Sequence, residues 1–518
     1  MKTTDCITRD VRAILADSSL THEQQVFALA QYAEDLLPQP ASEETENFNR
    51  FMEEGMLHDM GEGHAPYAPR YILPDYEKFL RNGSTFLRLD PPKTLYEALY
   101  SLLILYRNVP SVTHFPVYLG NLGTLLEPFT QGLSDEICKD LLRGFLIQLD
   151  RTMGDSFVHA NIGPERTRVG SLILELLPQL QNAIPNMTLI YDPAITPDDF
   201  AVRAISASLE CANPAFALDR AYRRDFGEIP YGIASCYNGL PIGGGAFTLQ
   251  RFMLGAIAAR AQNVDDFLQR VLPQVVHTMC VFMEGRIRFI VEETSFFRSN
   301  FLVREGLVQI DRFVGLAGLV GLADCVDILM EKEGKHLRFG PDGEANALGV
   351  RIMDTLSELV KSFKSAYSPA MGNHFLLHAQ VGLANDPCAP GVRIPIGEEL
   401  PLYDHLRQAG LYHKYFPTGV GDIFPFETTA KRNPEAILQI FKGAFSCGMR
   451  YISAYSADSD LVRVTGYLIK KSEVFAVKAG QQNSINDMSK IAYDTLTKNR
   501  ILERKVRCVD ASNGKSDY

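Results

Sequence analysis

A glycine-rich stretch at residues 231–245 is the first place where the sequence points to chemistry. It reads YGIASCYNGLPIGGG and carries a single thiol, Cys236. Five glycines and a proline in these fifteen residues exclude a long helix or strand. Because a long loop in a compact domain is more often functional than idle, Cys236 is a candidate reactive residue.

Two kinds of chemistry are open to Cys236, beside the role of an inert core thiol. A hydrolytic nucleophile needs a thiolate, and therefore a cationic or histidine neighbour that lowers the thiol pKa. The local residues Ile233, Ala234 and Tyr237 offer no such group. A thiol that gives up a hydrogen atom does not need to ionise, and an apolar loop shields a radical from side reactions.

A second feature is Gly466, which lies between bulky neighbours in Arg463-Val464-Thr465-Gly466-Tyr467. It follows a polar, acidic run at residues 456–460. Glycine weakens an apolar strand-like segment, so it marks either close approach by another group or a left-handed turn. These residues alone leave both interpretations open.

Other candidates are weaker. His374 and His378 have metal-ligand spacing for a helix, but the Glu of an H-E-x-x-H motif is missing, which favours buried structural histidines. The triplet 243–245 lacks the Lys-Ser/Thr of a phosphate-binding loop. Solvated or paired side chains are the simpler interpretation of five acid–base candidates: His114, Glu292, Glu293, Asp422 and Glu427. The sequence therefore predicts no metal site and no cofactor-binding residues.

Composition limits the function classes. The chain has 518 residues, of which 46% are hydrophobic and 22% charged, as in a soluble globular protein. A net charge of −11 argues against nucleic acid as a partner. The longest apolar run, 313–323, is too short to span a membrane and is expected in the core. Nine scattered cysteines without a C-x-x-C motif or a visible targeting signal indicate free thiols in the cytoplasm.

Hydrophobic periodicity predicts an α/β fold, because short apolar strands alternate with longer helices up to about residue 450. Helices are expected over 22–37, 94–107 and 134–153, and after an N-cap at Thr196. Strands are expected at 113–120, 157–164 and 187–191, and a basic, solvated helical tail at 487–507. The predicted organisation is an N-terminal helical extension (1–60), a closed-barrel catalytic domain (61–450) and a C-terminal segment with tail (451–518).

The run from Arg463 to Tyr467 resembles the R-V-x-G-[F/Y/W] motif of glycyl radical enzymes. Cys236 lies upstream, where that family carries its thiyl cysteine on a finger-like loop. Residues 181–193 and 319–324 are also similar to the family. The chain as a whole looks closest to the YjjI-type branch, which is related to anaerobic ribonucleotide reductase and formate acetyltransferase.

The resemblance implies a ten-stranded barrel of two antiparallel five-stranded parallel-sheet halves that encloses both loops. It implies a radical on Gly466, installed by a separate S-adenosylmethionine-dependent iron–sulfur activating enzyme, with no permanently bound cofactor. Cys236 would pass the hydrogen-atom vacancy to a small substrate, and Arg463 and Tyr467 would support the radical loop. Homodimers and oxygen sensitivity are further expectations. Glycine suits a backbone radical, because a side chain would crowd the planar α-carbon.

Three departures from the family bear on the reaction. Ser235 precedes Cys236, whereas acyl-transferring members use two adjacent cysteines. Asn238 stands where dehydratases and lyases commonly carry the Glu of G-C-x-E. The region before the glycine motif has only Cys447, instead of the four-cysteine zinc ribbon of anaerobic ribonucleotide reductases, although Gly466-Tyr467-Leu468 is reductase-like.

The predicted function is radical elimination or bond cleavage on a small polar anaerobic metabolite. Within the family, a reductase-like reaction on a ribose-containing substrate and acyl transfer are the alternatives. Outside it, a non-catalytic radical scaffold would tolerate substitution of Cys236. A cysteine hydrolase would be blocked by alkylation in air and indifferent to Gly466→Ala.

Overall fold

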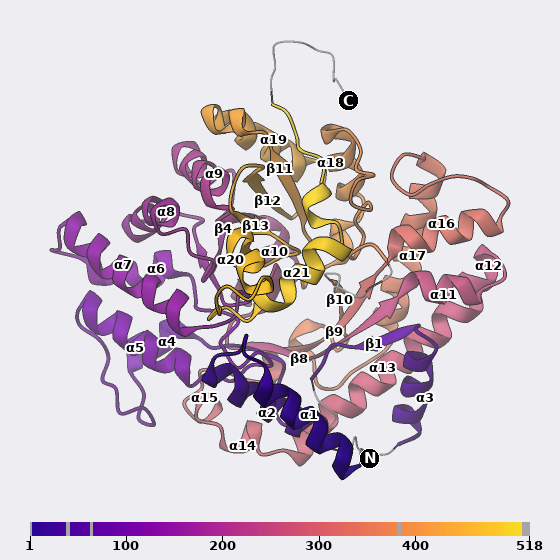
Figure 1. Ribbon diagram of the computed structural model, residues 1–518, viewed down its shortest axis with the longest axis horizontal. Coiled ribbons are helices and arrows are strands. Elements are labelled where there is room, and N and C mark those ends of the chain that lie inside the picture. Colours follow the sequence, from indigo (N-terminus) through magenta and orange to yellow (C-terminus); the bar gives the residue numbers. More distant parts are fainter. Residues whose placement is uncertain (1–2, 38–41, 63–65, 381–385, 387, 510–518) are drawn as a thin grey trace.

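Two five-stranded sheets, built mainly from buried strands, organise the chain. The computed structural model describes residues 3–37, 42–62, 66–380, 386 and 388–509. Helices surround the sheets, and the C-terminal segment crosses in front of them (Figure 1). Strands such as FVGLAGLV at 313–320 are apolar on both faces, which is typical of sheets covered on both sides.

The first sheet has the order β1-β8-β9-β10, and β2 also pairs with β8. Strands β8, β9 and β10 are parallel, while β1 and β2 run antiparallel to β8. The bounds are β1 (Leu57–Asp59), β2 (Tyr71–Leu73), β8 (Gly244–Met253), β9 (Phe313–Val320) and β10 (Leu376–Ala379).

The second sheet has the order β11-β12-β5-β4-β3. Strands β3, β4 and β5 are parallel, as are β11 and β12, but β12 is antiparallel to β5. Both sheets are therefore mixed, which corrects the expectation of parallel-sheet halves. The bounds are β3 (His159–Ile162), β4 (Asn186–Tyr191), β5 (Ala215–Leu218), β11 (Asp422–Phe426) and β12 (Tyr451–Ser456).

Helices lie to the left and to the right of the sheets in the view of Figure 1. Those at the left include α4 (Tyr76–Asn82), α5 (Leu95–Arg107), α6 (Leu122–Leu126), α7 (Asp135–Thr152), α8 (Arg168–Leu180) and α9 (Asp198–Cys211). Those at the right include α3 (Glu43–Glu53), α11 (Leu254–Arg260), α12 (Val264–Asp266), α13 (Leu272–Arg288), α16 (Leu322–Lys332) and α17 (Gly343–Ser362). Further helices are α10 (Asp219–Phe226), α14 (Phe296–Ser299), α15 (Phe301–Arg304), α18 (Leu402–Gly410) and α19 (Pro434–Ser446).

Most predicted elements are confirmed, and two local details are wrong. The segment 113–120 forms no strand, and its end joins β3 through two backbone hydrogen bonds, from the Leu119 N–H to the His159 carbonyl at 2.8 Å and from the Asn161 N–H to the Gly120 carbonyl at 2.9 Å. Thr196 does not cap α9, because Pro197 is the residue that precedes the helix and the Thr196 hydroxyl accepts instead from the Asp192 N–H at 3.1 Å. The apolar run at 313–323 is β9 and the start of α16, as expected of a core segment.

Two short hairpins stand apart from the large sheets. Strands β6 (Tyr231–Ala234) and β7 (Asn238–Pro241) form one, and β13 (Leu461–Arg463) and β14 (Leu468–Lys470) form the other. Their turns carry Cys236 and Gly466. The glycine-rich stretch around Cys236, predicted only to lack long regular structure, is thus a hairpin that leads directly into β8.

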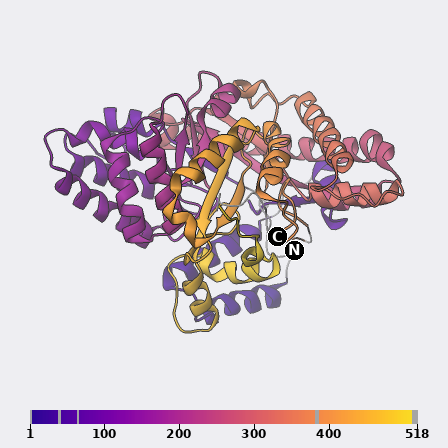
Figure 2. The ribbon, with the colours of Figure 1, turned by 90° about the horizontal axis from the view of Figure 1, so that it is seen from above.

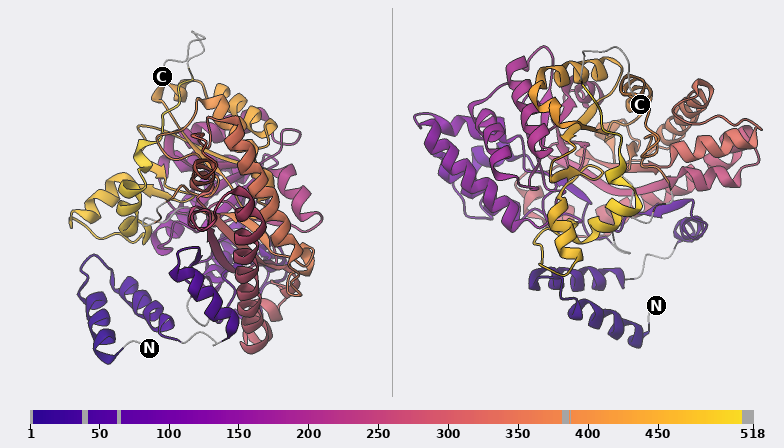
Figure 3. Two further views of the ribbon diagram at one scale, coloured as in Figure 1. Left: turned by 90° about the vertical axis from the view of Figure 1, so that its right-hand side faces the viewer. Right: turned by 45° about the horizontal axis from the view of Figure 1, so that its top comes forward.

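The first two α-helices of the described chain lie beside its last two α-helices on one face of the molecule. Helices α1 (Thr4–Ala16) and α2 (His22–Asp35) neighbour α20 (Lys471–Lys478) and α21 (Met488–Lys498) (Figures 2 and 3). The Gln24 amide donates to Asp487 at 2.6 Å and to the Ser484 carbonyl at 3.0 Å. The division of the chain at residues 60 and 450 stays a prediction. Within the described residues, no helix combines the length and apolar character needed to cross a membrane.

Candidate active site where two hairpins meet

Cys236 and Gly466 lie in contact at the turns of the two hairpins. A Cβ atom added to Gly466 would overlap Cβ of Cys236 and lie 3.0 Å from its sulfur. Gly466 does not have a positive φ, so the left-handed-turn interpretation is wrong. This position requires glycine because the thiol-bearing turn occupies the space of a side chain.

Polar side chains of β3 anchor the cysteine hairpin. The Asn161 amide donates to the Ile233 carbonyl and accepts from the Ile233 N–H, both at 2.9 Å. His159 Nδ1 donates to the Ser235 carbonyl at 2.6 Å, which leaves Nε2 to accept from the Thr188 hydroxyl at 2.7 Å. Burial lowers the His159 pKa to about 3, so this imidazole is neutral at physiological pH.

Two tyrosines hold the tip of the same hairpin. The Tyr451 hydroxyl donates to the Cys236 carbonyl at 3.3 Å, and the Tyr237 hydroxyl donates to the Ala379 carbonyl at 2.9 Å. Because Tyr451 begins β12 and Ala379 ends β10, the tip is fixed to both sheets. The position of the thiol is thus set by the strands around it.

The Gly466 carbonyl receives two donors. Asn186 Nδ2 donates to it at 2.6 Å, and Arg463 Nη1 donates at 3.3 Å. The buried Arg463 guanidinium also donates through Nε to the Ala212 carbonyl at 3.0 Å. Tyr467 is buried on the other side of the glycine, with its ring 5.2 Å from the ring of Phe157.

Two further arginines hold the carbonyls that precede Gly466. Arg504 donates to the carbonyls of Arg463, at 2.6 Å, and of Val464. Arg393 donates to the Thr465 carbonyl at 3.3 Å. The expectation of a solvated basic tail is therefore wrong for Arg504 and Arg507, which are buried, because the chain beyond α21 folds back against the glycine turn.

The Cys236 thiol is protonated at neutral pH. Burial raises its pKa to about 12, and the nearby Asp155 adds to that effect, while Arg393 and Arg463 oppose it. This environment is unsuited to a nucleophilic cysteine and compatible with hydrogen-atom transfer.

Asp155 is a site residue that the sequence analysis missed. It is buried, and burial together with the charge of Asp487 raises its pKa to about 7. One carboxylate oxygen accepts from the Phe157 N–H at 2.7 Å. A carboxyl group that exchanges its proton near neutral pH is a candidate general acid or base.

The raised pKa of Asp155 predicts that stability depends on pH. The folded protein keeps this proton up to about pH 7, whereas an unfolded aspartate loses it near pH 3.9, so stability falls as the pH rises between these values. We expect the urea-unfolding free energy of the wild type to fall by roughly 2–3 kcal/mol more between pH 5 and 8 than that of Asp155→Asn. Parallel curves for the two proteins would contradict the assignment.

The remaining candidates lie outside the contact of Cys236 and Gly466. His378 is buried on β10, where Nδ1 donates to the Thr418 carbonyl at 3.1 Å and burial lowers its pKa to about 4. Asp422 is paired with His405 at 2.9 Å. The others are exposed or half-buried: His114, Glu292, Glu293, His374 and Glu427. Gly243–Gly245 lead into β8, with the Gly243 N–H bound to the Leu73 carbonyl at 2.7 Å.

Comparison with known proteins identifies the family to which this chain belongs. The model for "Glycyl radical enzyme YjjI-like" matches residues 20–507. An uncharacterised protein from Haemophilus influenzae is 43% identical over 478 residues, which are 91% of this chain and 92% of the relative. An uncharacterised protein named YjjI from Escherichia coli is 40% identical over 497 residues, or 96% of this chain and 95% of the relative.

Solved glycyl radical enzymes share the fold at low sequence identity. Glycerol-bound, B12-independent glycerol dehydratase from Clostridium butyricum aligns with a TM-score of 0.69 at 12% identity, covering 90% of this chain and 82% of the dehydratase. The anaerobic ribonucleotide reductase from Thermotoga maritima aligns with a TM-score of 0.65 at 13% identity, covering 84% of this chain and 86% of the reductase. The predicted α/β fold and the resemblance are both confirmed: the chain belongs to the YjjI-like glycyl radical enzyme family.

Proposed function

We propose that this protein is a radical enzyme in which Gly466 stores the radical and Cys236 abstracts hydrogen from a small polar substrate. The observation that carries the proposal is that Cys236 fills the space beside the Gly466 α-carbon, where an added Cβ would lie 3.0 Å from the sulfur. A hydrogen atom moves directly only between groups in contact. Family membership supports the same chemistry, since its members carry a glycyl radical installed by a separate activase.

The surroundings of Gly466 suit a delocalised backbone radical. The unpaired electron spreads over the flanking amide groups when the α-carbon is planar, and glycine has no side chain to oppose that geometry. Asn186 and Arg463 donate to the Gly466 carbonyl, which favours resonance forms that place electron density on its oxygen. Arg463 and Tyr467 are therefore proposed as supporting residues of the radical turn.

The surroundings of Cys236 suit its proposed role as the radical relay. The raised thiol pKa keeps the S–H bond intact at neutral pH, and that bond is the one from which Gly466 takes a hydrogen atom. Loss of the hydrogen atom leaves a thiyl radical that abstracts hydrogen from substrate. The thiol recovers a hydrogen atom from the product radical at the end of the cycle.

Elimination or bond cleavage is the proposed reaction class. Next to the thiol, Asn238 replaces the glutamate base of many dehydratases, and an amide cannot take up a proton in that role. Asp155 lies close enough to raise the Cys236 pKa and itself titrates near pH 7, so we assign proton transfer to a leaving group to Asp155.

Unsatisfied polar atoms support a polar substrate. Four buried atoms next to the thiol and the glycine lack a hydrogen-bond partner among the described residues: Asn186 Oδ1, Asn238 Oδ1, Arg463 Nη2 and Thr465 Oγ1. Buried polar atoms are almost always paired in native proteins, so hydroxyl or carboxyl groups of a bound molecule would complete them. An apolar substrate would leave them unpaired.

Family membership supports further proposals about the closure of the fold, the partner and the assembly. The two five-stranded sheets are proposed to close as a ten-stranded barrel around the two hairpin turns. A radical S-adenosylmethionine activase with an iron–sulfur cluster is the proposed partner, and the active form is a cytoplasmic, oxygen-sensitive homodimer.

Anaerobic activation tests the proposal. The protein is incubated with the activase and S-adenosylmethionine, and electron paramagnetic resonance is expected to show a doublet from coupling to the single remaining Gly466 α-hydrogen. Exposure to air should then cut the chain at Gly466, giving a fragment of residues 1–465 in intact-mass spectra. An intact chain after radical formation and oxygen exposure would overturn the assignment of Gly466.

A further inference from the structure

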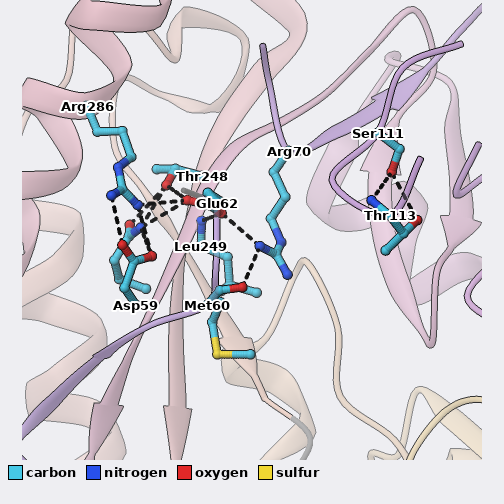
Figure 4. Close-up of polar contacts among 10 residues, drawn as sticks. Asp59, Met60, Glu62, Arg70, Ser111, Thr113, Thr248, Leu249 and Arg286 are labelled. Atoms are coloured by element: carbon cyan, nitrogen blue, oxygen red, sulfur yellow. Dashed lines mark hydrogen bonds and ion pairs between the residues drawn. The ribbon is translucent and has the colours of Figure 1, made fainter. Parts of the chain in front are cut away.

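The buried arginines of this protein fall into two groups. Seven of them are less than a tenth exposed within the described residues, and four have a carboxylate partner. Figure 4 shows two of these, with Arg70 3.0 Å from Glu62 and Arg286 2.7 Å from Asp59. Arg251 pairs with Asp386 at 2.6 Å, and Arg450 pairs with Asp225. In this group each buried positive charge is balanced.

The other three buried arginines have no carboxylate partner among the described residues. Arg463, Arg504 and Arg507 all lie in the C-terminal segment, around the glycine turn. Arg463 and Arg504 donate to backbone carbonyls. Arg507 donates to the Leu400 carbonyl at 2.6 Å and to His405 at 2.8 Å. Neutral acceptors leave the charge uncompensated, and an uncompensated buried charge costs several kcal/mol.

A cavity of about 20 Å³ lies beside these residues. Four cationic side chains line it, Arg393, Arg504, Lys505 and Arg507, against the two carboxylates Glu399 and Asp422. Asp422 accepts a hydrogen bond from His405 at 2.9 Å and lies 3.9 Å from Arg393, so its charge is shared with a cation that already lines the cavity. Arg507 is 7% exposed, and its Nε–H has no hydrogen-bond partner among the described residues.

We propose that this cavity binds one small anion, a halide or a carboxylate of the size of formate. A single water requires about 10–15 Å³ by the same measure, so the cavity accommodates one or two water-sized groups and excludes larger anions. The unpaired Arg507 Nε–H supplies a directed donor, and Arg504, Arg393 and Lys505 supply the surrounding positive charge. Burial lowers the pKa values of Arg504 and Arg507, and the nearby carboxylate of Asp422 offsets this only in part.

The anion site is connected to the radical turn through Arg504. This side chain lines the cavity and also donates to the carbonyls of Arg463 and Val464, which precede Gly466. An anion that fixes Arg504 and Arg507 therefore also fixes the backbone carbonyls that precede Gly466. Release of the anion is proposed to loosen the glycine turn, so that an activase can reach Gly466. The anion site does not depend on the radical, so anion binding can be tested in the unactivated protein.

Hydrogen exchange of the unactivated protein tests the proposal. Ionic strength is held constant with sodium gluconate, an anion too large for the cavity, and gluconate is replaced stepwise by chloride or by formate. If opening of the glycine turn releases the anion, an anion concentration ten times the dissociation constant slows amide exchange at 461–470 and 500–507 by about tenfold. Exchange in α8 should not respond. The half-saturating concentrations of chloride and formate are then compared, and the lower of the two shows whether the ligand is a halide or a carboxylate.

Two substitutions with opposite effects separate this site from a general salt effect. Arg507→Gln is expected to weaken the anion response at least tenfold, whereas Glu399→Gln removes a negative charge from the lining and is expected to strengthen it. Arg143→Gln, on α7, is the matched control and should respond like the wild type. The proposal would be overturned if amide exchange were equally slow in gluconate and in chloride. It would also be overturned if both lining variants responded to the anion like the wild type. If Arg507→Gln does not fold, Glu399→Gln alone decides.

Discussion

Gly466→Ala is expected to abolish the activase-dependent radical and to destabilise the protein. The added methyl group would overlap Cβ of Cys236, so one of the two hairpin turns must move. Overpacking of this kind costs about 1–3 kcal/mol. Denaturant unfolding measures the destabilisation, and electron paramagnetic resonance after incubation with the activase measures the loss of the doublet.

Gly443→Ala provides the matched control. Gly443 is an exposed residue of α19, and an added Cβ there has no atom within 4 Å. Alanine is preferred over glycine in a helix, so this variant is expected to gain up to about 1 kcal/mol and to keep the radical. A Gly466→Ala protein with an undiminished doublet would contradict the assignment of the radical to Gly466.

Cys236→Ser is expected to keep the Gly466 radical and to lose substrate turnover by at least about a thousandfold, if the thiol relays the radical. An O–H bond is much stronger than an S–H bond, so a glycyl radical cannot draw a hydrogen atom from serine. Activated wild type and variant are each incubated anaerobically with a panel of small polar metabolites. Mass spectrometry then follows which metabolite the wild type consumes and at what rate.

Cys280→Ala is the matched control for this substitution, because Cys280 is a fully buried thiol on α13 that takes no part in the proposed reaction. It should consume the same metabolite at a rate close to that of the wild type. Equal consumption by Cys236→Ser and wild type would show that Cys236 is dispensable and would favour a non-catalytic scaffold. Loss of the doublet in Cys236→Ser would instead point to a role in radical formation.

The sequence predicted the contact between Cys236 and Gly466 only through the resemblance to a family. Local patterns identified two unusual segments, since glycines interrupt an apolar run in each. They could not show that the segments meet, because the two turns lie on hairpins far apart in the chain. They also left open a left-handed turn at Gly466, which only the backbone geometry excludes.

Residues that hold the site were missed for a similar physical reason. Asn186, His159 and Arg504 act through hydrogen bonds to backbone carbonyls of distant segments, and no periodicity in the sequence records such a pairing. The basic tail illustrates this most clearly, because a run rich in Lys and Arg is typical of a solvated helix. Arg504 and Arg507 lie beyond the end of that helix and are buried.

Solvent deuterium provides the most direct test of the central claim, that Gly466 and Cys236 exchange a hydrogen atom. A thiol exchanges its proton with solvent, so reversible transfer between the two residues carries deuterium from D2O to the Gly466 α-carbon. Deuterium splits the signal much less than hydrogen does. We predict that the doublet of the activated wild type collapses toward a singlet in D2O and that the doublet of Cys236→Ser persists. A doublet that persists in the wild type, or that collapses equally in Cys236→Ser, would contradict the account.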